Sequence, residues 1–180
     1  MSRKYLNDKY CVRCGRKEAC PYLRNNYDLL LRTFYTKDCN PKYPCYRTLD
    51  VIDIGCGNGR NSEFIKKKGH NVMSLDMVND YGVETILGQD ELPVKDNSVD
   101  IILCNYLMMF LSPKERNQLI KEIKRVSKAN SIIMLELYPA KDSYAKTDEE
   151  MVKMQEKIFK KIGWEKVRYR KGKFIARKVK

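Results

Sequence analysis

Three glycines at alternate positions follow an acidic residue in the middle of the chain: Asp53 is succeeded by Gly55, Gly57 and Gly59. Glycines at this spacing permit a tight turn and let a ligand approach bare backbone. A helix that starts directly after such a loop adds free N–H donors. The loop is therefore predicted to bind a small ligand between a buried strand at 49–54 and the helix that follows it.

Two residues beside the loop narrow the chemistry of this ligand. Asp53 would repel a pyrophosphate, and Arg60 stands where the third glycine of a dinucleotide fingerprint would fall. The same carboxylate attracts an ammonium or a sulfonium group. The pattern therefore favours S-adenosyl-L-methionine, which carries both cations, over NAD or FAD. Asp76 lies 17 residues after Gly59, a spacing that suits a hydroxyl-binding acid at the end of the next strand.

The elements that must position these residues alternate between strands and helices. Strands are predicted at 49–54, 71–76, 84–87, 99–104 and 131–137, with a closing hairpin of strands at 164–170 and 173–179. Capping boxes at Ser112 and Thr147 predict two later helices, and an N-terminal helix is expected to start at Asn25 or Asn26. The order predicts an α/β fold: a doubly wound, mostly parallel sheet with a C-terminal antiparallel hairpin and an N-terminal helical extension.

Three segments carry a family resemblance: residues 51–60 (Val-Ile-Asp-Ile-Gly-Cys-Gly-Asn-Gly-Arg), residues 69–76 and residues 88–100. They resemble the class I, Rossmann-like S-adenosylmethionine-dependent methyltransferases. The type-11 branch, which includes enzymes of ubiquinone and menaquinone biosynthesis, is the most similar, over about residues 48–137. The resemblance implies a methyltransferase domain at 48–180 that acts on a small-molecule acceptor, preceded by a cysteine-rich, basic extension at 1–47.

The resemblance also implies roles for individual residues. The glycines would line the methionine end of the cofactor, and Asp53 would hold the loop or the amino group. Asp76 would bind the ribose hydroxyls, and Asp90, or else Gln89, would face the adenine amino group. Asn105 and Tyr106 would face the methyl group and the acceptor. The predicted cofactor-binding residues are Asp53, Gly55, Cys56, Gly57, Gly59, Asp76, Met77, Asp90, Glu91, Leu92 and Asn105, and the predicted catalytic residues are Asn105 and Tyr106.

No nucleophilic side chain is required for this chemistry, because methyl transfer from a sulfonium is an in-line displacement that needs alignment and exclusion of water. Cys104 is accordingly interpreted as a core cysteine and His70 as a structural residue. The signature Asn/Asp-Pro-Pro-Tyr of enzymes that methylate amino groups of nucleic acids is absent, since residues 104–107 read Cys-Asn-Tyr-Leu.

Five of the seven cysteines lie in residues 1–47. A Cys-x-x-Cys pair followed by a second pair is typical of tetrahedral zinc, so Cys11, Cys14, Cys39 and Cys45 are predicted to form a structural zinc site. Cys39 and Cys45 are more widely spaced than is usual. Ordinary reduced thiols, or an iron–sulfur or metalloid site, are the alternatives.

The net charge of +13 is unevenly distributed, with +7 in residues 1–47, −3 in residues 48–159 and +9 in residues 160–180. The basic ends are either solvated faces or a surface for an anionic partner. An rRNA or tRNA methyltransferase and a non-catalytic cofactor-binding partner subunit are therefore alternatives to a small-molecule enzyme. Because the chain has no signal-peptide pattern and no apolar run of roughly 20 residues, no membrane association and a cytoplasmic location are expected.

Overall fold

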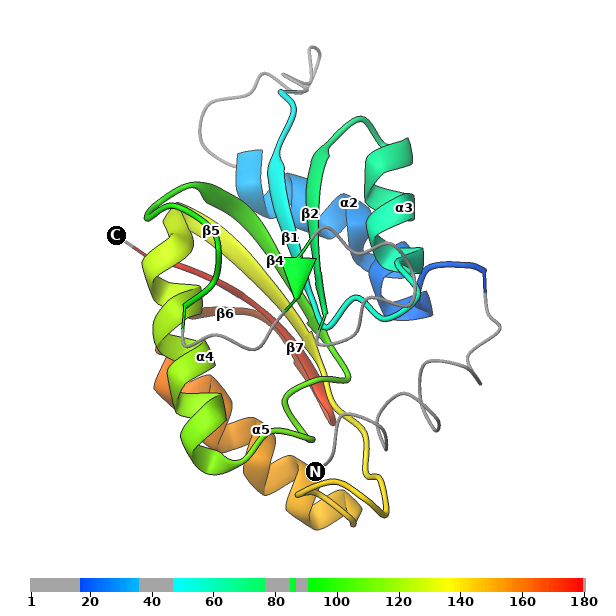
Figure 1. Cartoon of the computed structure of the whole chain (residues 1–180), viewed down its shortest axis with the longest axis vertical. Coiled ribbons are helices and arrows are strands. Elements are labelled where there is room, and N and C mark those ends of the chain that lie inside the picture. Colours follow the sequence, from blue (N-terminus) through cyan, green and yellow to red (C-terminus); the bar gives the residue numbers. More distant parts are fainter. Residues whose placement is uncertain (1–16, 36–46, 77–84, 87–90, 180) are drawn as a thin grey trace.

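A seven-stranded sheet in the order β3-β2-β1-β4-β5-β7-β6 forms the centre of the structure, a computed structural model that describes residues 17–35, 47–76, 85–86 and 91–179 (Figure 1). Only β7 runs in the direction opposite to the other six strands, so the predicted doubly wound, mostly parallel sheet is confirmed. The strands are β1 (Asp50–Ile54), β2 (Asn71–Asp76), β3 (Thr85–Ile86), β4 (Val99–Asn105), β5 (Ser127–Glu136), β6 (Glu165–Arg170) and β7 (Lys173–Arg177).

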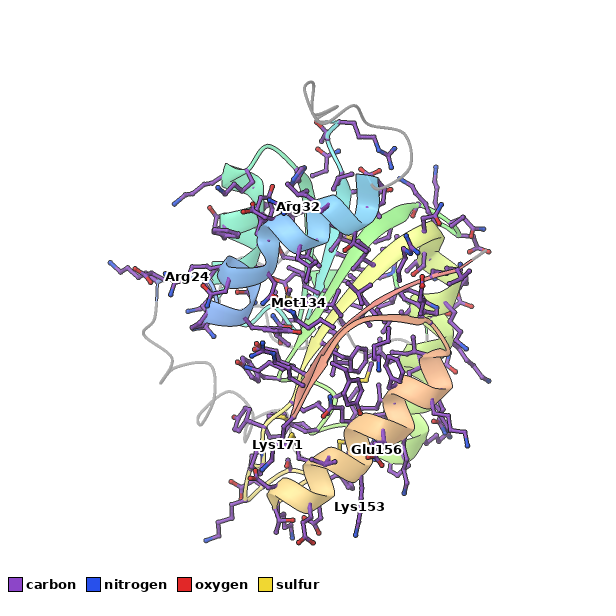
Figure 2. All side chains as sticks on the ribbon, turned by 180° about the vertical axis from the view of Figure 1, so that it is seen from behind. Arg24, Arg32, Met134, Lys153, Glu156 and Lys171 are labelled. Atoms are coloured by element: carbon purple, nitrogen blue, oxygen red, sulfur yellow. The ribbon has the colours of Figure 1, made fainter. Side chains whose placement is uncertain are left out.

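Two pairs of helices cover the two faces of this sheet (Figure 1). One face carries α2 (Pro21–Tyr35) and α3 (Arg60–Lys67), and the other carries α4 (Pro113–Val126) and α5 (Asp148–Ile162). The strands alternate between two apolar cores: Leu103 and Met134 face α2, whereas Cys104 and Leu135 face α4 and α5. Figure 2 shows Met134 in the sheet beneath α2. No helix within the described residues is long and apolar enough to cross a membrane.

Burial settles the interpretation of Cys104, which is wholly inaccessible to solvent in the core beneath α4 and α5. Desolvation raises the pKa of its thiol to about 12. A thiol with such a pKa is protonated at neutral pH and makes a poor nucleophile. The prediction of a core cysteine is therefore confirmed.

The predicted helix starts at Ser112 and Thr147 are confirmed. In each capping box the hydroxyl of the cap accepts an N–H from the third helical residue, and the glutamate at that position accepts the N–H of the cap. Gly163 ends α5 in the left-handed conformation, with φ of 67°, and donates its N–H to Phe159.

The predicted start of the N-terminal helix is wrong, because α2 begins at Pro21 and not at Asn25 or Asn26. Proline suits the first helical turn, since its φ is already helical and its missing N–H has no partner there. The cap is Cys20, whose Sγ accepts the Leu23 N–H at 3.4 Å. Asn26 lies inside the helix, where its amide donates to the Tyr22 carbonyl at 2.7 Å.

His70 ties α2 to the start of β1. Its Nδ1 accepts the Leu49 N–H at 3.3 Å, and its Nε2 lies 2.8 Å from the Tyr27 hydroxyl. Because Nδ1 accepts, the neutral ring carries its proton on Nε2 and donates it to Tyr27. Burial lowers the pKa of His70, which favours this neutral form. The structural interpretation of His70 agrees with these contacts.

The last strands differ in detail from the prediction. Strand β5 begins at Ser127, four residues before the predicted start, and Lys128 from this early part contacts Asp50 at 2.9 Å and the buried Asp100 at 3.1 Å. The hairpin strand β7 inserts between β5 and β6. The antiparallel strand β7 therefore lies inside the sheet, and β6 forms the edge. The hairpin was predicted to add an antiparallel strand at this edge.

Candidate active site

The predicted site residues gather where the carboxyl ends of β1, β2 and β4 meet. The strand order reverses between β1 and β4, since β2 and β3 lie on one side of β1 and the later strands lie on the other. Asp53 is paired with Leu103 near the end of β1, and Asn105 is the last residue of β4. Ligands of doubly wound sheets bind at such a reversal, outside the carboxyl ends of the strands.

The three glycines of the loop all have positive φ, at 74° for Gly55, 55° for Gly57 and 71° for Gly59. A Cβ at Gly55 would lie 3.0 Å from the Cβ of Leu107, so this glycine is required by packing. A Cβ at Gly57 or Gly59 would meet no atom of the described residues within 4 Å. These two glycines leave one side of the loop open, as a ligand that approaches the backbone requires.

Asp53 lies beneath the loop with 1% of its surface exposed. The Ser62 hydroxyl of α3 donates to its Oδ2 at 2.7 Å. Burial raises the pKa of Asp53 to about 6, although the hydrogen bond from Ser62 opposes this shift. A nearby cation would therefore strongly favour the ionised form of Asp53.

Asp76 and Arg60 both follow the glycine loop in the sequence. The Gly57 N–H donates to Oδ2 of Asp76 at 2.7 Å, so the carboxylate at the end of β2 fixes the middle of the loop. Arg60 is the first residue of α3, and its buried Nη1 has no hydrogen-bond partner among the described residues. A buried hydrogen-bond donor of this kind requires an acceptor.

Asn105 is 6% exposed at the end of β4, and its Nδ2 donates to the Cys20 Sγ at 3.4 Å. Its Oδ1 has no partner among the residues that the structure describes. Cys20 is fully buried, and desolvation raises the pKa of its thiol to about 11, so it is protonated at neutral pH.

Tyr106 follows with a φ of 61°, a conformation that a tyrosine rarely adopts. Its N–H donates to the Glu136 carbonyl at 2.9 Å, and its ring packs edge-to-face on Tyr138 with centroids 5.3 Å apart. Burial raises the pKa of Tyr106. The phenol is therefore neutral and held at the end of β4 by its neighbours.

Three residues of this region were not predicted: Cys20, Ser62 and Glu136. Glu136 ends β5 with 2% exposure, and its Oε2 has no partner in the described part of the chain. The sequence carries a signal for Glu136, because a single acid closes an otherwise apolar predicted strand at 131–137. Ser62 could have been found from its place one turn into the helix after the loop. No sequence signal links Cys20 to Asn105, which lies 85 residues away.

Several predicted residues lie outside the described residues: Met77, Gln89 and Asp90, together with the four predicted zinc ligands Cys11, Cys14, Cys39 and Cys45. Within the described ranges, no group of three or more histidine, cysteine, aspartate or glutamate residues is placed to hold a metal ion. The cysteines Cys20, Cys56 and Cys104 are buried free thiols.

The loop at Glu91 and Leu92 is held against α4. The Leu92 N–H donates to Oε2 of Glu122 at 2.8 Å, and Arg125 donates to the Leu92 carbonyl at 3.0 Å. Arg125 also donates to both carboxylate oxygens of Glu122 and to the Val94 carbonyl at 2.9 Å. One arginine thus links the predicted adenine end of the site to the helix below it.

Replacing Arg125 by alanine is expected to lower the free energy of unfolding by about 2 kcal/mol, because the buried Glu122 carboxylate would keep only the Leu92 N–H as a partner and the Leu92 carbonyl would lose its arginine donor. Urea unfolding measures this loss. Lys121→Ala, at an exposed position of the same helix, is the control and should change stability by less than about 0.5 kcal/mol. Equal effects of the two substitutions would contradict the assigned role of Arg125.

Residues 52–135 match the model of a family described as "Methyltransferase domain". Phosphoethanolamine N-methyltransferase 1 of Triticum aestivum is 32% identical over 109 residues, which are 51% of this chain and 22% of that protein. The enzyme of the same name from Caenorhabditis elegans is 29% identical over 108 residues, again 51% of this chain and 22% of that protein. The chain therefore covers about a fifth of the length of these curated relatives.

Solved structures agree in fold. A SAM-dependent methyltransferase from Methanosarcina mazei superposes with a TM-score of 0.58 at 17% identity, over 90% of this chain and 99% of that one. The 1,6-didemethyltoxoflavin-N1-methyltransferase of Burkholderia thailandensis, solved with 1,6-didemethyltoxoflavin and S-adenosylhomocysteine, gives a TM-score of 0.57 at 16% identity, over 90% of this chain and 92% of that one.

The sheet order and the open glycine loop at its reversal point define a Rossmann-like fold of the methyltransferase type. The match of residues 52–135 and the shared fold support a class I, S-adenosylmethionine-dependent methyltransferase domain of the type-11 branch. The resemblance predicted from the sequence is thereby confirmed.

Proposed function

We propose that the protein transfers a methyl group from S-adenosylmethionine to a small-molecule acceptor. The observation that carries this proposal is the open glycine loop together with two carboxylates on the adjacent strands β1 and β2, Asp53 and Asp76. Matched relatives are named for methyl transfer to phosphoethanolamine, and a structural relative is named for methyl transfer to N1 of 1,6-didemethyltoxoflavin. These names support a small acceptor.

The residues present fit the cofactor. Arg60 offers a buried donor without a partner in the described part of the chain, and this donor complements the carboxylate of the methionine moiety. Asp53 complements its ammonium, and the bare backbone of Gly57 and Gly59 leaves room for close approach. Asp76 would hold the ribose hydroxyls as well as the Gly57 amide. When bound, S-adenosylmethionine supplies an activated methyl group on a sulfonium.

The remaining contacts with the cofactor and the acceptor are proposed because of where these residues lie in the chain. Leu92 is 5% exposed and would cover the adenine with apolar surface, while Cys56 lies in the loop itself. Asn105 and Tyr106, at the end of β4, would align the acceptor. The buried pair Met108 and Met109 packs behind them and excludes water from this side.

The relatives give the RNA alternative no support, since those matched are named for small acceptors. The roles of Met77, Asp90 and Glu91, the zinc site at Cys11 and Cys14 with its second cysteine pair, the domain boundary at residue 48 and the cytoplasmic location all stay predictions from the sequence.

The proposal is tested by incubating the purified chain with S-adenosylmethionine tritiated on the methyl group and a cell extract, then fractionating the extract into small molecules, RNA and protein. Label is expected in the small molecules, with an equal amount of S-adenosylhomocysteine formed. Gly57→Val, which closes the open side of the loop, is the control and should transfer no label. Label confined to RNA or protein would overturn the small-molecule acceptor. Cofactor binding without any transfer would indicate a non-catalytic subunit.

A further inference from the structure

Four polar residues form a row across the carboxyl end of the sheet. Asn105 of β4 pairs with Glu136 of β5, Glu136 pairs with Lys173 of β7, and Lys173 pairs with Arg170 of β6. Residues directly opposite one another on neighbouring strands project from the same face of a sheet. This face is the one that α2 covers, since Asn105 contacts Cys20 and the Lys173 ammonium lies 5.0 Å from the Tyr22 ring centroid.

One end of this row is rich in buried oxygen atoms that lack partners. Oε2 of Glu136, Oδ1 of Asn105 and the hydroxyl of Tyr22 have no hydrogen-bond partner in the described residues, and these residues are 2%, 6% and 7% exposed. An unsatisfied buried polar group costs about 1–3 kcal/mol. A ligand that brings hydrogen-bond donors to this end would recover that free energy.

The other end of the row is cationic. Neighbouring strands lie about 5 Å apart, so the backbones of Lys173 and Arg170 stand about 5 and 10 Å from that of Glu136. Burial raises the pKa of Glu136, whereas a hydrogen bond with Tyr106 and the charges of Lys173 and Arg60 favour its ionised form. The Glu136 carboxylate, which accepts hydrogen bonds, therefore lies one strand away from the positive charge of Lys173.

We propose that this row binds the methyl acceptor and that the acceptor is a small amine with an anionic substituent. The nitrogen donates hydrogen bonds to Glu136 and Asn105, and the anionic group lies towards Lys173 and Arg170. The inference rests on the proposed methyl transfer and names the class of acceptor. Glu136 lies beside Asn105, the last residue of β4, which is where the resemblance puts the transferred methyl group.

Glu136 also provides a destination for the proton that the reaction releases. The Glu136 carboxylate takes one proton from the ammonium of the acceptor and becomes a carboxylic acid, which leaves a neutral amine. The lone pair of this amine forms the new nitrogen–carbon bond while the methyl–sulfur bond breaks, and sulfur keeps that electron pair as a thioether. The methylated nitrogen carries the positive charge, and Glu136 returns its proton to solvent after the product leaves.

The test uses the full chain with three probes: phosphoethanolamine, ethanolamine and 2-mercaptoethanol. Formation of S-adenosylhomocysteine gives kcat and KM, and calorimetry gives the cofactor Kd. Glu136→Gln is expected to lower kcat for phosphoethanolamine about 100-fold, with the cofactor Kd changed by less than about threefold. Lys173→Met is expected to raise KM for phosphoethanolamine about tenfold and to leave KM for ethanolamine unchanged. Lys166→Met, at an exposed position of β6, is the control.

The outcomes separate the inference from the proposed function. Transfer only to 2-mercaptoethanol would leave methyl transfer standing and overturn the amine acceptor. Full activity of Glu136→Gln on amines would equally overturn it, and absence of transfer to every probe and to every extract fraction would overturn both proposals. Urea unfolding shows whether Glu136→Gln folds. If it does not, the effect of Lys173→Met on KM for phosphoethanolamine and on KM for ethanolamine decides whether the inference holds.

Discussion

Alanine at position 76 is expected to weaken S-adenosylmethionine binding about 100-fold. A hydrogen bond to a charged group contributes about 1.5–3 kcal/mol, and Asp76 is proposed to accept two from the ribose. The substitution also removes the acceptor of the Gly57 N–H, which the carboxylate holds at 2.7 Å. Isothermal titration calorimetry measures the change in Kd.

Two further variants make the Asp76 result specific. Asp76→Asn keeps an oxygen that accepts hydrogen bonds but removes the charge, so its loss of affinity should be smaller than that of Asp76→Ala. Glu149→Ala removes an exposed acid from α5 and should leave Kd unchanged. An unchanged Kd for Asp76→Ala would remove Asp76 from the proposed cofactor site.

Asparagine at position 53 is expected to change how stability depends on pH. Because the pKa of Asp53 is raised to about 6 in the fold from an ordinary value of 3.8, the folded state holds a proton that the unfolded state has released between these values. The free energy of unfolding should therefore fall as the pH rises from about 4 to about 6, by about 3 kcal/mol at most. Asp53→Asn removes this contribution, so the variant should be the more stable protein at pH 7.5.

Urea unfolding of both proteins at pH 4.5 and pH 7.5 isolates the contribution of Asp53, since all other titrating groups are shared. The affinity for the cofactor should depend on pH in the opposite direction to the stability. It should increase in the wild type as the pH rises through about 6, because only ionised Asp53 attracts the ammonium, and it should be weak and independent of this titration in Asp53→Asn. Identical pH profiles of stability in the two proteins would show that Asp53 titrates normally.

The parts of the fold that the sequence predicts are those set by short-range signals. The glycines at 55, 57 and 59 require positive φ, and the capping boxes at Ser112 and Thr147 satisfy the first N–H groups of their helices locally. Apolar runs of strand length separated by helices were enough to predict a parallel sheet. The acid at the end of β2 could likewise be placed from its spacing alone.

Features that depend on contacts between distant segments could not be predicted. The start of α2 is set by Pro21 and by the Cys20 thiol, a side chain that seldom serves as a cap. The contact of Cys20 with Asn105 arises only once α2 lies across the sheet. The polar row through Glu136 likewise depends on the insertion of β7 beside β5, which the order of elements along the chain does not reveal.

The position of α2 has a consequence for how such an enzyme changes its substrate over evolution. The cofactor loop lies inside residues 52–135, the part that matches the family model, whereas Cys20, Tyr22 of α2 and Lys173 of β7 lie outside it. The two halves of the proposed reaction site are thus encoded by different stretches of the chain. Substitutions of Tyr22 or Lys173 are therefore expected to change the preference for the acceptor while the binding of the methyl donor is kept.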